Sequence, residues 1–220
     1  MSGILYIVAT PIGNLKDITL RALEILKSVD LILAEDSRVT VGLLKAYEIV
    51  KPIKAFHQHS KNTKWIIDEL KLGKNLALVS DAGTPGVNDP GGILIQEIVN
   101  SSPDVKIVPV PGVSALTTLM SVAGISLENF KYLGFIPHKK GRQTIFKMIN
   151  EMEMAAIFFE STHRIIKTLE QLHEVAPNKK IVLGRELTKM FETIYRGTIP
   201  EVIEKLNSSS TKGEFTVIVY

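Results

Sequence analysis

The chain has 220 residues, a length typical of one or two compact domains, and its 26 Lys and Arg exceed its 23 Asp and Glu by a formal net charge of +3. Apolar residues make up 45% and charged residues 22%, which excludes a long disordered protein, and no apolar run approaches the roughly 18 residues of a membrane span. Because the chain contains no Cys, disulfides, thiolate metal ligands and a Cys nucleophile are excluded, and we expect a cytoplasmic, enzyme-sized protein with no membrane partner.

The first half of the chain alternates short apolar runs with helical patterns. The apolar runs predict buried strands at residues 4–9, 31–34, 76–79 and 106–110. Apolar positions at helical spacing predict helices at 65–72 and 93–99, and another after Thr19, whose hydroxyl is expected to cap it. Strand and helix in alternation are typical of a mainly parallel sheet with helices on both faces.

The second half breaks this rhythm at residues 124–129, where we place a domain boundary between residues 1–123 and 124–220. Further strands are predicted at 132–136, 155–159, 181–183, 193–196 and 214–220, with a helix at 164–172. Tight strand-to-helix turns are rare here, which favours a mixed sheet. The sequence therefore predicts two α/β domains, the first with a mainly parallel sheet and the second with a mixed sheet.

Positive charge is concentrated in the second half. Residues 1–123 carry 12 basic and 12 acidic side chains, whereas residues 124–220 carry 14 and 11. No acid occurs in residues 131–150, and that segment contains Lys131, Lys139, Lys140, Arg142 and Lys147. Such a segment is typical of phosphate partners, nucleic acid among them, although an exposed, solvated loop has the same composition.

Gly- and Pro-rich loops follow three of the predicted strands, at residues 10–14, 80–92 and 110–115. In open parallel sheets, ligands bind where such loops meet at the carboxyl ends of the strands. We expect Asp81 to be buried there, Gly112 to let the backbone approach a ligand, and Ser114 to cap the next helix. No loop matches the dinucleotide or P-loop patterns, so a nucleoside ligand of another kind remains. The alternative is that Gly and Pro merely turn the chain.

Two other polar segments carry weaker signals. His57 and His59 lack a third ligand at a suitable spacing, so no metal site is expected. Thr162 is predicted to cap a helix, which would expose His163 and Arg164 at an N-terminus suited to anions. A capping role alone explains this segment as well as a contact with RNA does.

A known family shares a series of segments with this sequence, in the same order. They are LYIVATPIGNL at residues 5–15, DITLRAL at 17–23, AEDSR at 34–38, SDAGTPGVNDPG at 80–91, PGVSA at 111–115 and RELTK at 185–189. With them the chain resembles the ribosomal RNA small subunit methyltransferase I family of the tetrapyrrole methylase superfamily over residues 5–219. The resemblance implies a cofactor cleft between the two α/β domains.

The resemblance also implies an activity, a cofactor and partners. The activity is S-adenosylmethionine-dependent 2′-O-methylation of a cytidine ribose in the decoding region of small-subunit (16S) rRNA, by a homodimer acting on the rRNA or the assembled small subunit. The cofactor contacts that it implies are Pro11, Asp81, Ala82, Gly83, Val87, Ser114, Ala115, Phe159 and Arg185. We interpret Lys139, Lys140, Arg142 and Arg164 as RNA contacts.

Methyl transfer to a ribose hydroxyl needs a base, or a cation that stabilises the developing alkoxide, because the hydroxyl is a weak nucleophile. The charged candidates follow two predicted strands. They are Glu35, Asp36 and Arg38 in the first half, and Glu186 and Lys189 in the second. An ion-pair network without a catalytic role is the alternative, and the sequence does not select the base.

Two rival functions stay open. One is a small-molecule methylase acting on a tetrapyrrole, and the other is a non-catalytic RNA- or ribosome-binding protein of the same fold. The basic segment around Lys139 and Lys140 favours RNA, because a tetrapyrrole calls for a closed pocket rather than an exposed cationic segment.

Overall fold

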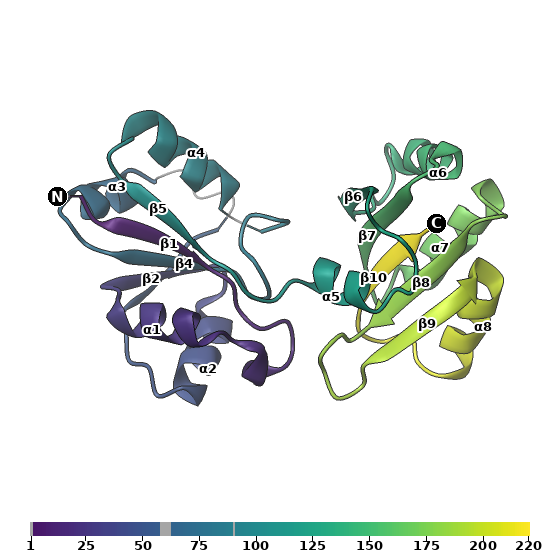
Figure 1. Ribbon diagram of the computed structural model, residues 1–220, viewed down its shortest axis with the longest axis horizontal. Coiled ribbons are helices and arrows are strands. Elements are labelled where there is room, and N and C mark those ends of the chain that lie inside the picture. The colour runs from purple at the N-terminus through teal and green to yellow at the C-terminus, as the bar shows by residue number, and fades with distance from the viewer. Residues whose placement is uncertain (1, 58–62, 90) are drawn as a thin grey trace. The chain divides into compact units, whose positions relative to one another are not determined.

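The computed structural model describes residues 2–57, 63–89 and 91–220 (Figure 1). His59 and Pro90 lie outside the described residues. The chain divides into two compact units, Met1–Ser114 and Ala115–Tyr220, and each contains a sheet. Helix α5 (Ala115–Ser121) belongs to the second unit, where it contacts β10 (Glu214–Val219). The domain boundary after residue 123 stays a prediction.

The first unit is built on a parallel sheet, as predicted. Its described strands are β1 (Ile4–Val8), β2 (Leu31–Ala34), β3 (Ile53–Ala55), β4 (Leu76–Val79) and β5 (Lys106–Val110), in the order β3-β2-β4-β1-β5. All of their pairings are parallel. The sequence pattern missed β3 because Lys54 and Ala55 are exposed at the sheet edge and leave no apolar run.

Helices cover both faces of this sheet (Figure 1), which confirms the prediction. Alternate residues of β4 point to opposite faces: Leu76 and Leu78 pack with α3 (Lys64–Lys71) and α4 (Gly92–Ser101), and Ala77 and Val79 pack with α1 (Leu20–Ser28) and α2 (Ser37–Ala46). A sheet buried on both faces accounts for the uninterrupted apolar strands of the first half.

Two helix starts illustrate how capping side chains set the boundaries. Thr19 caps α1 as predicted, since its Oγ1 accepts a hydrogen bond from the backbone N–H of Ala22 at 3.1 Å. Helix α2 was not predicted. Asp36 caps it, since its Oδ1 accepts a hydrogen bond from the backbone N–H of Arg38 at 2.8 Å. The polar residues that follow β2 therefore also begin a helix.

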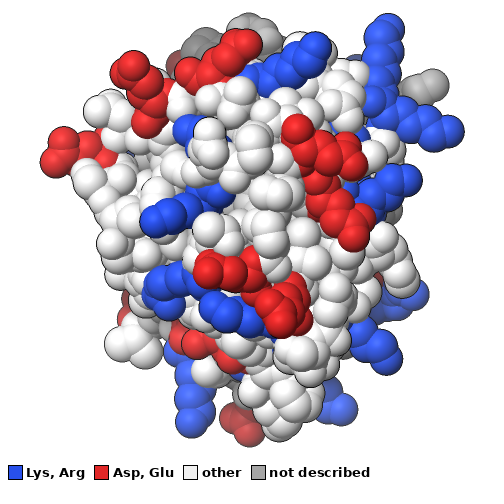
Figure 2. Space-filling model, turned by 90° about the vertical axis from the view of Figure 1, so that its right-hand side faces the viewer, with Lys and Arg blue, Asp and Glu red and all other residues white. Residues whose placement is uncertain are grey.

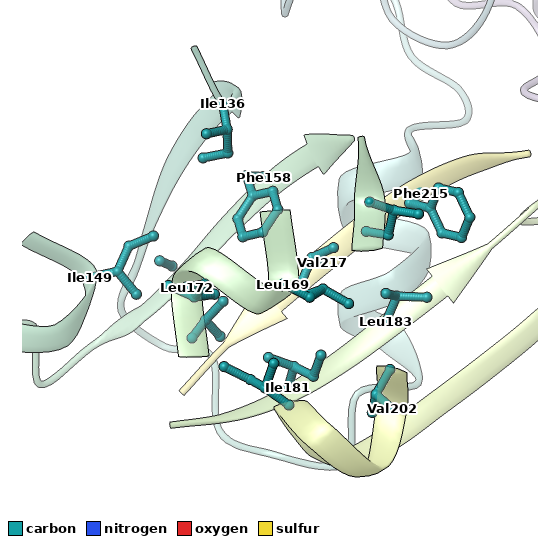
Figure 3. Close-up of a cluster of buried hydrophobic side chains, with 14 of the residues drawn as sticks. Ile136, Ile149, Phe158, Leu169, Leu172, Ile181, Leu183, Val202, Phe215 and Val217 are labelled. Atoms are coloured by element: carbon teal, nitrogen blue, oxygen red, sulfur yellow. The ribbon is translucent and has the colours of Figure 1, made fainter. Parts of the chain in front are cut away.

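The second unit contains a mixed sheet, which confirms the second prediction of sheet type. Its described strands are β6 (Phe130–Phe135), β7 (Ala155–Ser161), β8 (Lys180–Arg185), β9 (Thr193–Thr198) and β10, in the order β6-β7-β10-β8-β9. Strands β6 and β7 pair in parallel and the other pairs are antiparallel. Helices α6 (Arg142–Glu151), α7 (Ile165–Val175) and α8 (Ile199–Ser208) pack on one face, where Phe158, Leu183 and Val217 form part of the core (Figure 3).

In this unit one local prediction is wrong, and the alternative of a solvated loop for the basic segment holds only in part. The basic segment is not one loop, because α6 begins at Arg142 and buries Phe146 and Ile149. Thr162 does not cap α7: its hydroxyl exchanges hydrogen bonds of 2.7 Å with the backbone of Gly213, and the helix begins only at Ile165. In the part of the chain that the structure describes, no helix combines the length and apolar character needed to cross a membrane.

Candidate functional site

The carboxyl ends of β1 and β4 form a topological switch point in the first unit. The two strands are neighbours, yet the chain leaves β1 towards α1 on one face and leaves β4 towards α4 on the other. Thr10 and Gly83 join the two outgoing loops by paired backbone hydrogen bonds, with N···O distances of 2.9 and 3.0 Å. Ligands of open α/β sheets bind at such a point, so this is the candidate site.

The three Gly- and Pro-rich loops meet around Gly83. A Cβ at Gly83 would lie 3.4 Å from Cγ2 of Ile12 in the first loop and 3.6 Å from the carbonyl oxygen of Val113 in the third. Thr84 donates a hydrogen bond from Oγ1 to that same carbonyl at 3.2 Å. Gly83 has φ of +83°, a conformation that costs an L-residue about 1–2 kcal/mol.

Two buried hydroxyl groups hold the backbone of this junction by hydrogen bonds. Thr10 Oγ1 donates to the carbonyl oxygen of Ser80 at 3.1 Å, and Ser80 Oγ donates to that of Gly83 at 3.3 Å. Both hydroxyl-bearing residues are buried. The main chain at the ends of β1 and β4 is therefore fixed by hydrogen bonds before any ligand arrives.

One expectation about these loops is wrong. Asp81 is exposed rather than buried, and its Oδ1 accepts a hydrogen bond from the backbone N–H of Asp36 at 2.9 Å. A Cβ at Gly112 would lie 2.9 Å from Cβ of Ala9, and the approach of its backbone to a ligand stays a prediction. Gly112 is needed for close packing against the end of β1.

Carboxylates around the junction have divergent pKa values. Burial raises the pKa of Glu35, and the charge of Asp89 raises it further, against a hydrogen bond from the backbone of Asp81. Burial also raises the pKa of Asp89. Hydrogen bonds from the side chain and backbone of Arg38 instead lower the pKa of Asp36 to about 2. Glu35 is therefore a stronger base than its neighbour Asp36.

The residues present fit the S-adenosylmethionine that the resemblance implies. Gly83 lacks the side chain that would fill the junction, the exposed carboxylate of Asp81 can accept hydrogen bonds from an amine or hydroxyl, and Ala82 and Val87 offer exposed apolar surface. Pro11 is buried beside Thr10, and Ser114 is partly exposed at the end of this unit. A cavity of about 360 Å³ adjoins the same loop and is lined by Phe56, Gly86, Val87, Asn88, Asp89, Gly91, Gly92, Ile93 and Gln96.

The remaining predicted cofactor residues lie in the second unit, and two of them point to opposite faces of its sheet. Phe159 pairs with Thr216 and Arg185 pairs with Phe215, and successive residues of a strand face opposite ways. Phe159 packs edge-on against Tyr132 and Phe135, at ring centroid distances of 5.5 and 5.7 Å. Arg185 is buried and donates from Nε to the carbonyl oxygen of Lys212 at 2.6 Å. Ala115 is the first residue of α5.

The predicted catalytic pair Glu186 and Lys189 occupies a strained turn after β8. Glu186 and Thr188 have φ of 51° and 66°, which is rare for residues other than Gly. Glu186 Oε1 accepts hydrogen bonds from Lys189 Nζ at 3.0 Å and from the backbone N–H of Glu214 at 2.9 Å. Lys189 also pairs with the Glu214 carboxylate at 2.8 Å. These contacts tie the turn to the start of β10.

The same contacts set the charge states of this pair. Burial alone would raise the pKa of Glu186, but the hydrogen bonds from Glu214 and Lys189 outweigh it and lower the pKa. Burial would lower the pKa of Lys189, but its bonds to Glu214 and Glu186 raise it. Glu186 is thus a poor base, and Lys189 a firmly charged cation.

The predicted RNA contacts fall into two groups. Lys139 and Lys140 are exposed, and neither takes part in an ion pair among residues 2–57, 63–89 and 91–220. Arg142 is only 7% exposed, and Arg164 is partly buried in an ion pair with Glu160 at 3.3 Å. The structure therefore separates two surface amines from two guanidinium groups held inside the unit.

The face of the second unit that carries α7 and α8 does not have charge of a single sign. Figure 2 views the molecule from the side where Figure 1 draws α7 and α8, and it shows Lys and Arg side chains interspersed with Asp and Glu. Attraction of a polyanion to this face would therefore depend on local groups of cations rather than on a uniform charge.

Sequence reasoning missed two buried polar residues beneath these lysines. Glu160 is 1% exposed and Thr168 is 0% exposed, and their side chains are joined by a hydrogen bond of 2.7 Å. An acid placed directly after the apolar run 155–159 is a signal that the sequence offered. Thr168 gave no signal, because one Thr in a helical pattern is unremarkable.

Comparison with known proteins finds relatives that align over nearly the whole of this chain. The family model of Tetrapyrrole (Corrin/Porphyrin) Methylases matches residues 4–203. The ribosomal RNA small subunit methyltransferase I of Haemophilus influenzae is 46% identical and the alignment covers 100% of this chain and 79% of the relative. The protein of that name from Thermotoga maritima is 42% identical, with 99% and 98% covered.

Solved structures share the fold at low sequence identity. A cobalt precorrin-4 methyltransferase superposes with a TM-score of 0.67 at 18% identity, covering 98% of this chain and 93% of that one. A diphthine synthase gives a TM-score of 0.76 at 14% identity, covering 98% and 89%. These likenesses establish the fold of two α/β domains and no more than that.

Proposed function

This chain belongs to the ribosomal RNA small subunit methyltransferase I family of tetrapyrrole methylases, and we propose that it methylates the 2′-hydroxyl of a cytidine ribose in the decoding region of 16S rRNA. It is an S-adenosylmethionine-dependent methyltransferase. The homodimer implied by the resemblance, and a substrate of either rRNA or the assembled small subunit, are parts of the same proposal.

The observation that supports this substrate most strongly is sequence identity across nearly the whole chain. Relatives named for small-subunit rRNA match at 39–46% identity over 99–100% of it. The fold alone does not select a substrate, since its solved members include a corrin precursor methyltransferase and a diphthine synthase.

We assign the cofactor contacts of the first unit to the junction around Gly83. S-adenosylmethionine supplies the methyl group on a positively charged sulfonium. The chain's part is to bind and orient: hydrogen bonds between Thr10 and Gly83 hold two of the loops in place, which lowers the conformational entropy lost on binding. Contacts from Ala115, Phe159 and Arg185 stay predictions.

We propose Glu35 as the group that accepts the proton of the ribose hydroxyl. It lies at the carboxyl end of β2, next to the loop after β4 that carries Asp81, and its raised pKa makes it a stronger base than an ordinary carboxylate. Asp36 and Glu186, which the sequence also put forward, have lowered pKa values and are bound to Arg38 and Lys189 respectively. Arg38 and Lys189 are left as cations that can stabilise a developing alkoxide.

For RNA binding, we propose that Lys139 and Lys140 contact phosphates directly. Both are exposed just before the start of α6, within the segment 131–150 that contains no acid. Arg142 and Arg164 are assigned an indirect role, because their guanidinium groups are bound to groups within the unit.

The activity is tested by supplying cofactor with a labelled methyl group to small ribosomal subunits, free 16S rRNA and a tetrapyrrole. We expect label in the ribosomal substrate and none in the tetrapyrrole. Label in the tetrapyrrole would support the small-molecule methylase, and binding of subunits without transfer would support the non-catalytic alternative. Sedimentation of the protein alone checks for the mass of two chains.

The RNA contact is tested by replacing Lys139 and Lys140 together with Ala. We expect weaker binding to small ribosomal subunits, and the slope of log affinity against log salt should fall by about two, because two phosphates are no longer neutralised. Lys27 and Lys71, which are exposed in the first unit, give a matched double variant with the same change of charge. An equal effect in both variants would contradict a specific role for Lys139 and Lys140.

A further inference from the structure

A buried polar cluster lies directly beneath the segment that carries Lys139 and Lys140. Its centre is Glu160 at the end of β7, whose side chain is fully buried. Glu160 Oε1 accepts a hydrogen bond from the backbone N–H of Ser161 at 2.8 Å, and Oε2 accepts one from Thr168 Oγ1 at 2.7 Å. A carboxylate so far from water persists only with charged or hydrogen-bonded partners.

Arg142 is the first cation of this cluster. It donates from Nη2 to Thr168 Oγ1 at 2.7 Å, so the Thr168 hydroxyl accepts from the guanidinium and donates to Glu160. The Nε group donates to Gln171 Oε1 at 2.7 Å, and Nη1 donates to the carbonyl oxygen of Pro137 at 3.2 Å. Arg142 thereby connects β7 and α7 to the main chain just after β6.

Arg164 reaches the same stretch of main chain from the start of α7. Its Nη2 pairs with Glu160 Oε2 at 3.3 Å and also donates to the carbonyl oxygen of Ile136. Its Nη1 lies 3.2 Å from Nε2 of His138. Two guanidinium groups, one paired with the buried carboxylate and the other linked to it through Thr168, therefore bind the carbonyls of consecutive residues.

These contacts restrain the segment at both of its ends. Ile136 and Pro137 are held by the two arginines, and at the other end the backbone N–H of Arg142 bonds to the carbonyl of Lys139 at 3.3 Å. Gly141, with φ of +85°, turns the chain into α6. Lys139 and Lys140 lie between these restraints, with their side chains exposed.

The composition of the cluster points to more than packing. Buried ionic groups seldom stabilise a fold better than apolar side chains of similar volume. What this cluster supplies is a set of donors aimed at main-chain carbonyls, which an apolar core does not provide. The apolar core of the unit lies alongside, with Phe158 and Leu169 packed between sheet and helix (Figure 3).

We propose that Glu160 is a positioning residue for RNA binding: through Thr168, Arg142 and Arg164 it fixes the main chain of residues 136–141, so that Lys139 and Lys140 meet the RNA phosphates in a preset arrangement. The inference rests on the proposed contact between these two lysines and RNA. Preorganisation of this kind raises affinity by lowering the entropy lost on binding.

Thr168→Val tests the proposal, because it removes the bridging hydroxyl with almost no change of volume. We expect the Kd for small ribosomal subunits to rise about 10-fold and the affinity for S-adenosylmethionine to stay unchanged. Thr216→Val is the matched control. Thr216 is also buried, but its side chain lies on the face of the sheet opposite to the one that Glu160 and α7 occupy. Its Kd is expected to stay at the wild-type value.

A double-mutant cycle separates positioning from general structural damage. In a chain that already carries Lys139→Ala and Lys140→Ala, Thr168→Val should add less than about 2-fold to Kd, because there are no amines left to position. Hydrogen exchange of the amides at 138–141 should speed up in Thr168→Val while the amides of β8 and β10 keep their protection. Arg164→Lys, which keeps the charge but loses the fork of donors, should reproduce both effects if Thr168→Val does not fold.

The outcomes distinguish this inference from the proposed function. If the double Lys variant weakens binding but Thr168→Val and Arg164→Lys do not, the positioning role is overturned and the RNA contact stands. If Thr168→Val weakens binding equally with and without the two lysines, it acts elsewhere and the role is also overturned. If the double Lys variant binds normally, the proposed RNA contact fails and the positioning role with it.

Discussion

The junction of loops in the first unit and the buried cluster in the second unit are both held together by polar groups. The junction uses mainly backbone groups, whereas the cluster uses side chains. Around Gly83 the contacts are mainly backbone to backbone or hydroxyl to backbone. Around Glu160 they join its carboxylate to the side chains of Arg142 at the start of α6, Arg164 just before α7 and Thr168 within α7. The first arrangement follows from the end of a parallel sheet, whereas the second depends on long side chains meeting across a core.

This difference predicts that the two regions respond differently to substitutions. A junction made by main chain tolerates changes in neighbouring side chains and suits a ligand recognised through backbone and small residues. A cluster made by charged side chains fails when one member is removed, because a buried partner is left unpaired. Variants in each region test whether the junction tolerates substitutions and whether the cluster fails when one member is removed.

The largest effect is expected from Glu35→Gln. If Glu35 accepts the ribose proton, the change should lower kcat by about 10²- to 10⁴-fold and leave the affinities for cofactor and RNA nearly unchanged. Asp36→Asn is the neighbouring control, and it should have a much smaller effect because the low pKa of Asp36 makes it a poor base. Equal losses of kcat in the two variants would remove Glu35 from this role.

The next largest effect is expected from breaking the buried cluster. Arg142→Ala should lower the free energy of unfolding by about 2–4 kcal/mol, because it leaves Thr168, Gln171 and the Pro137 carbonyl without a donor. Arg38→Ala breaks an ion pair in the first unit whose Arg side chain is 90% exposed, and stability should barely change. Chemical denaturation of both variants measures the contrast, and similar losses would contradict it.

A smaller effect is expected from Gly83→Ala. The positive φ of Gly83 should cost about 1–2 kcal/mol of unfolding free energy, and the altered junction should weaken cofactor binding about 10-fold. Gly124→Ala carries the same kind of strain at φ of +73°, with nothing within 4 Å of the added Cβ. Calorimetry should find normal cofactor affinity in the Gly124 variant; weakened binding in both would mean that strain alone is responsible.

The smallest effect is a shift of pH dependence in Asp89→Asn. Glu35 must be deprotonated to act as a base, so kcat should rise with pH through its raised pKa. Removing the Asp89 charge lowers that pKa, and the acidic limb of the profile should move to lower pH while staying above the ordinary range for Glu, because burial remains. A limb that stays in place or moves to higher pH would show that another group controls it.

The same shift predicts the sign of a stability change. The folded state binds the Glu35 proton more tightly than the unfolded state does. Its contribution to stability is therefore complete below the ordinary Glu pKa and is lost as pH rises through the raised pKa. Glu35→Gln should remove this part of the pH dependence, which denaturation at a series of pH values can measure.

The sequence predicted the features that depend on local pattern. Continuous apolar runs such as 76–79 identified buried strands, Thr19 identified a helix start, and the Gly- and Pro-rich segments identified loops that do meet at the sheet end. These features could be found because each depends on residues that are close in sequence.

Features that depend on long-range contacts were not predicted. The exposure of Asp81, the packing of Gly112 against Ala9 and the burial of Arg142 are set by segments distant in the chain. The choice of Glu35 over Asp36 also needed the fold, because burial near Asp89 and pairing with Arg38 shift their pKa values in opposite directions. Neighbouring carboxylates look alike in a sequence.

The most direct test of the account is the position of the methyl group on the RNA. Small ribosomal subunits labelled by this protein are digested with alkali, which cleaves RNA only where a free 2′-hydroxyl is present. We predict that the label is recovered in a single alkali-resistant dinucleotide whose 5′ nucleoside is cytidine, and that Glu35→Gln transfers almost none. Label in the mononucleotides that alkali releases would show that the methyl group is on a base, which would contradict the account.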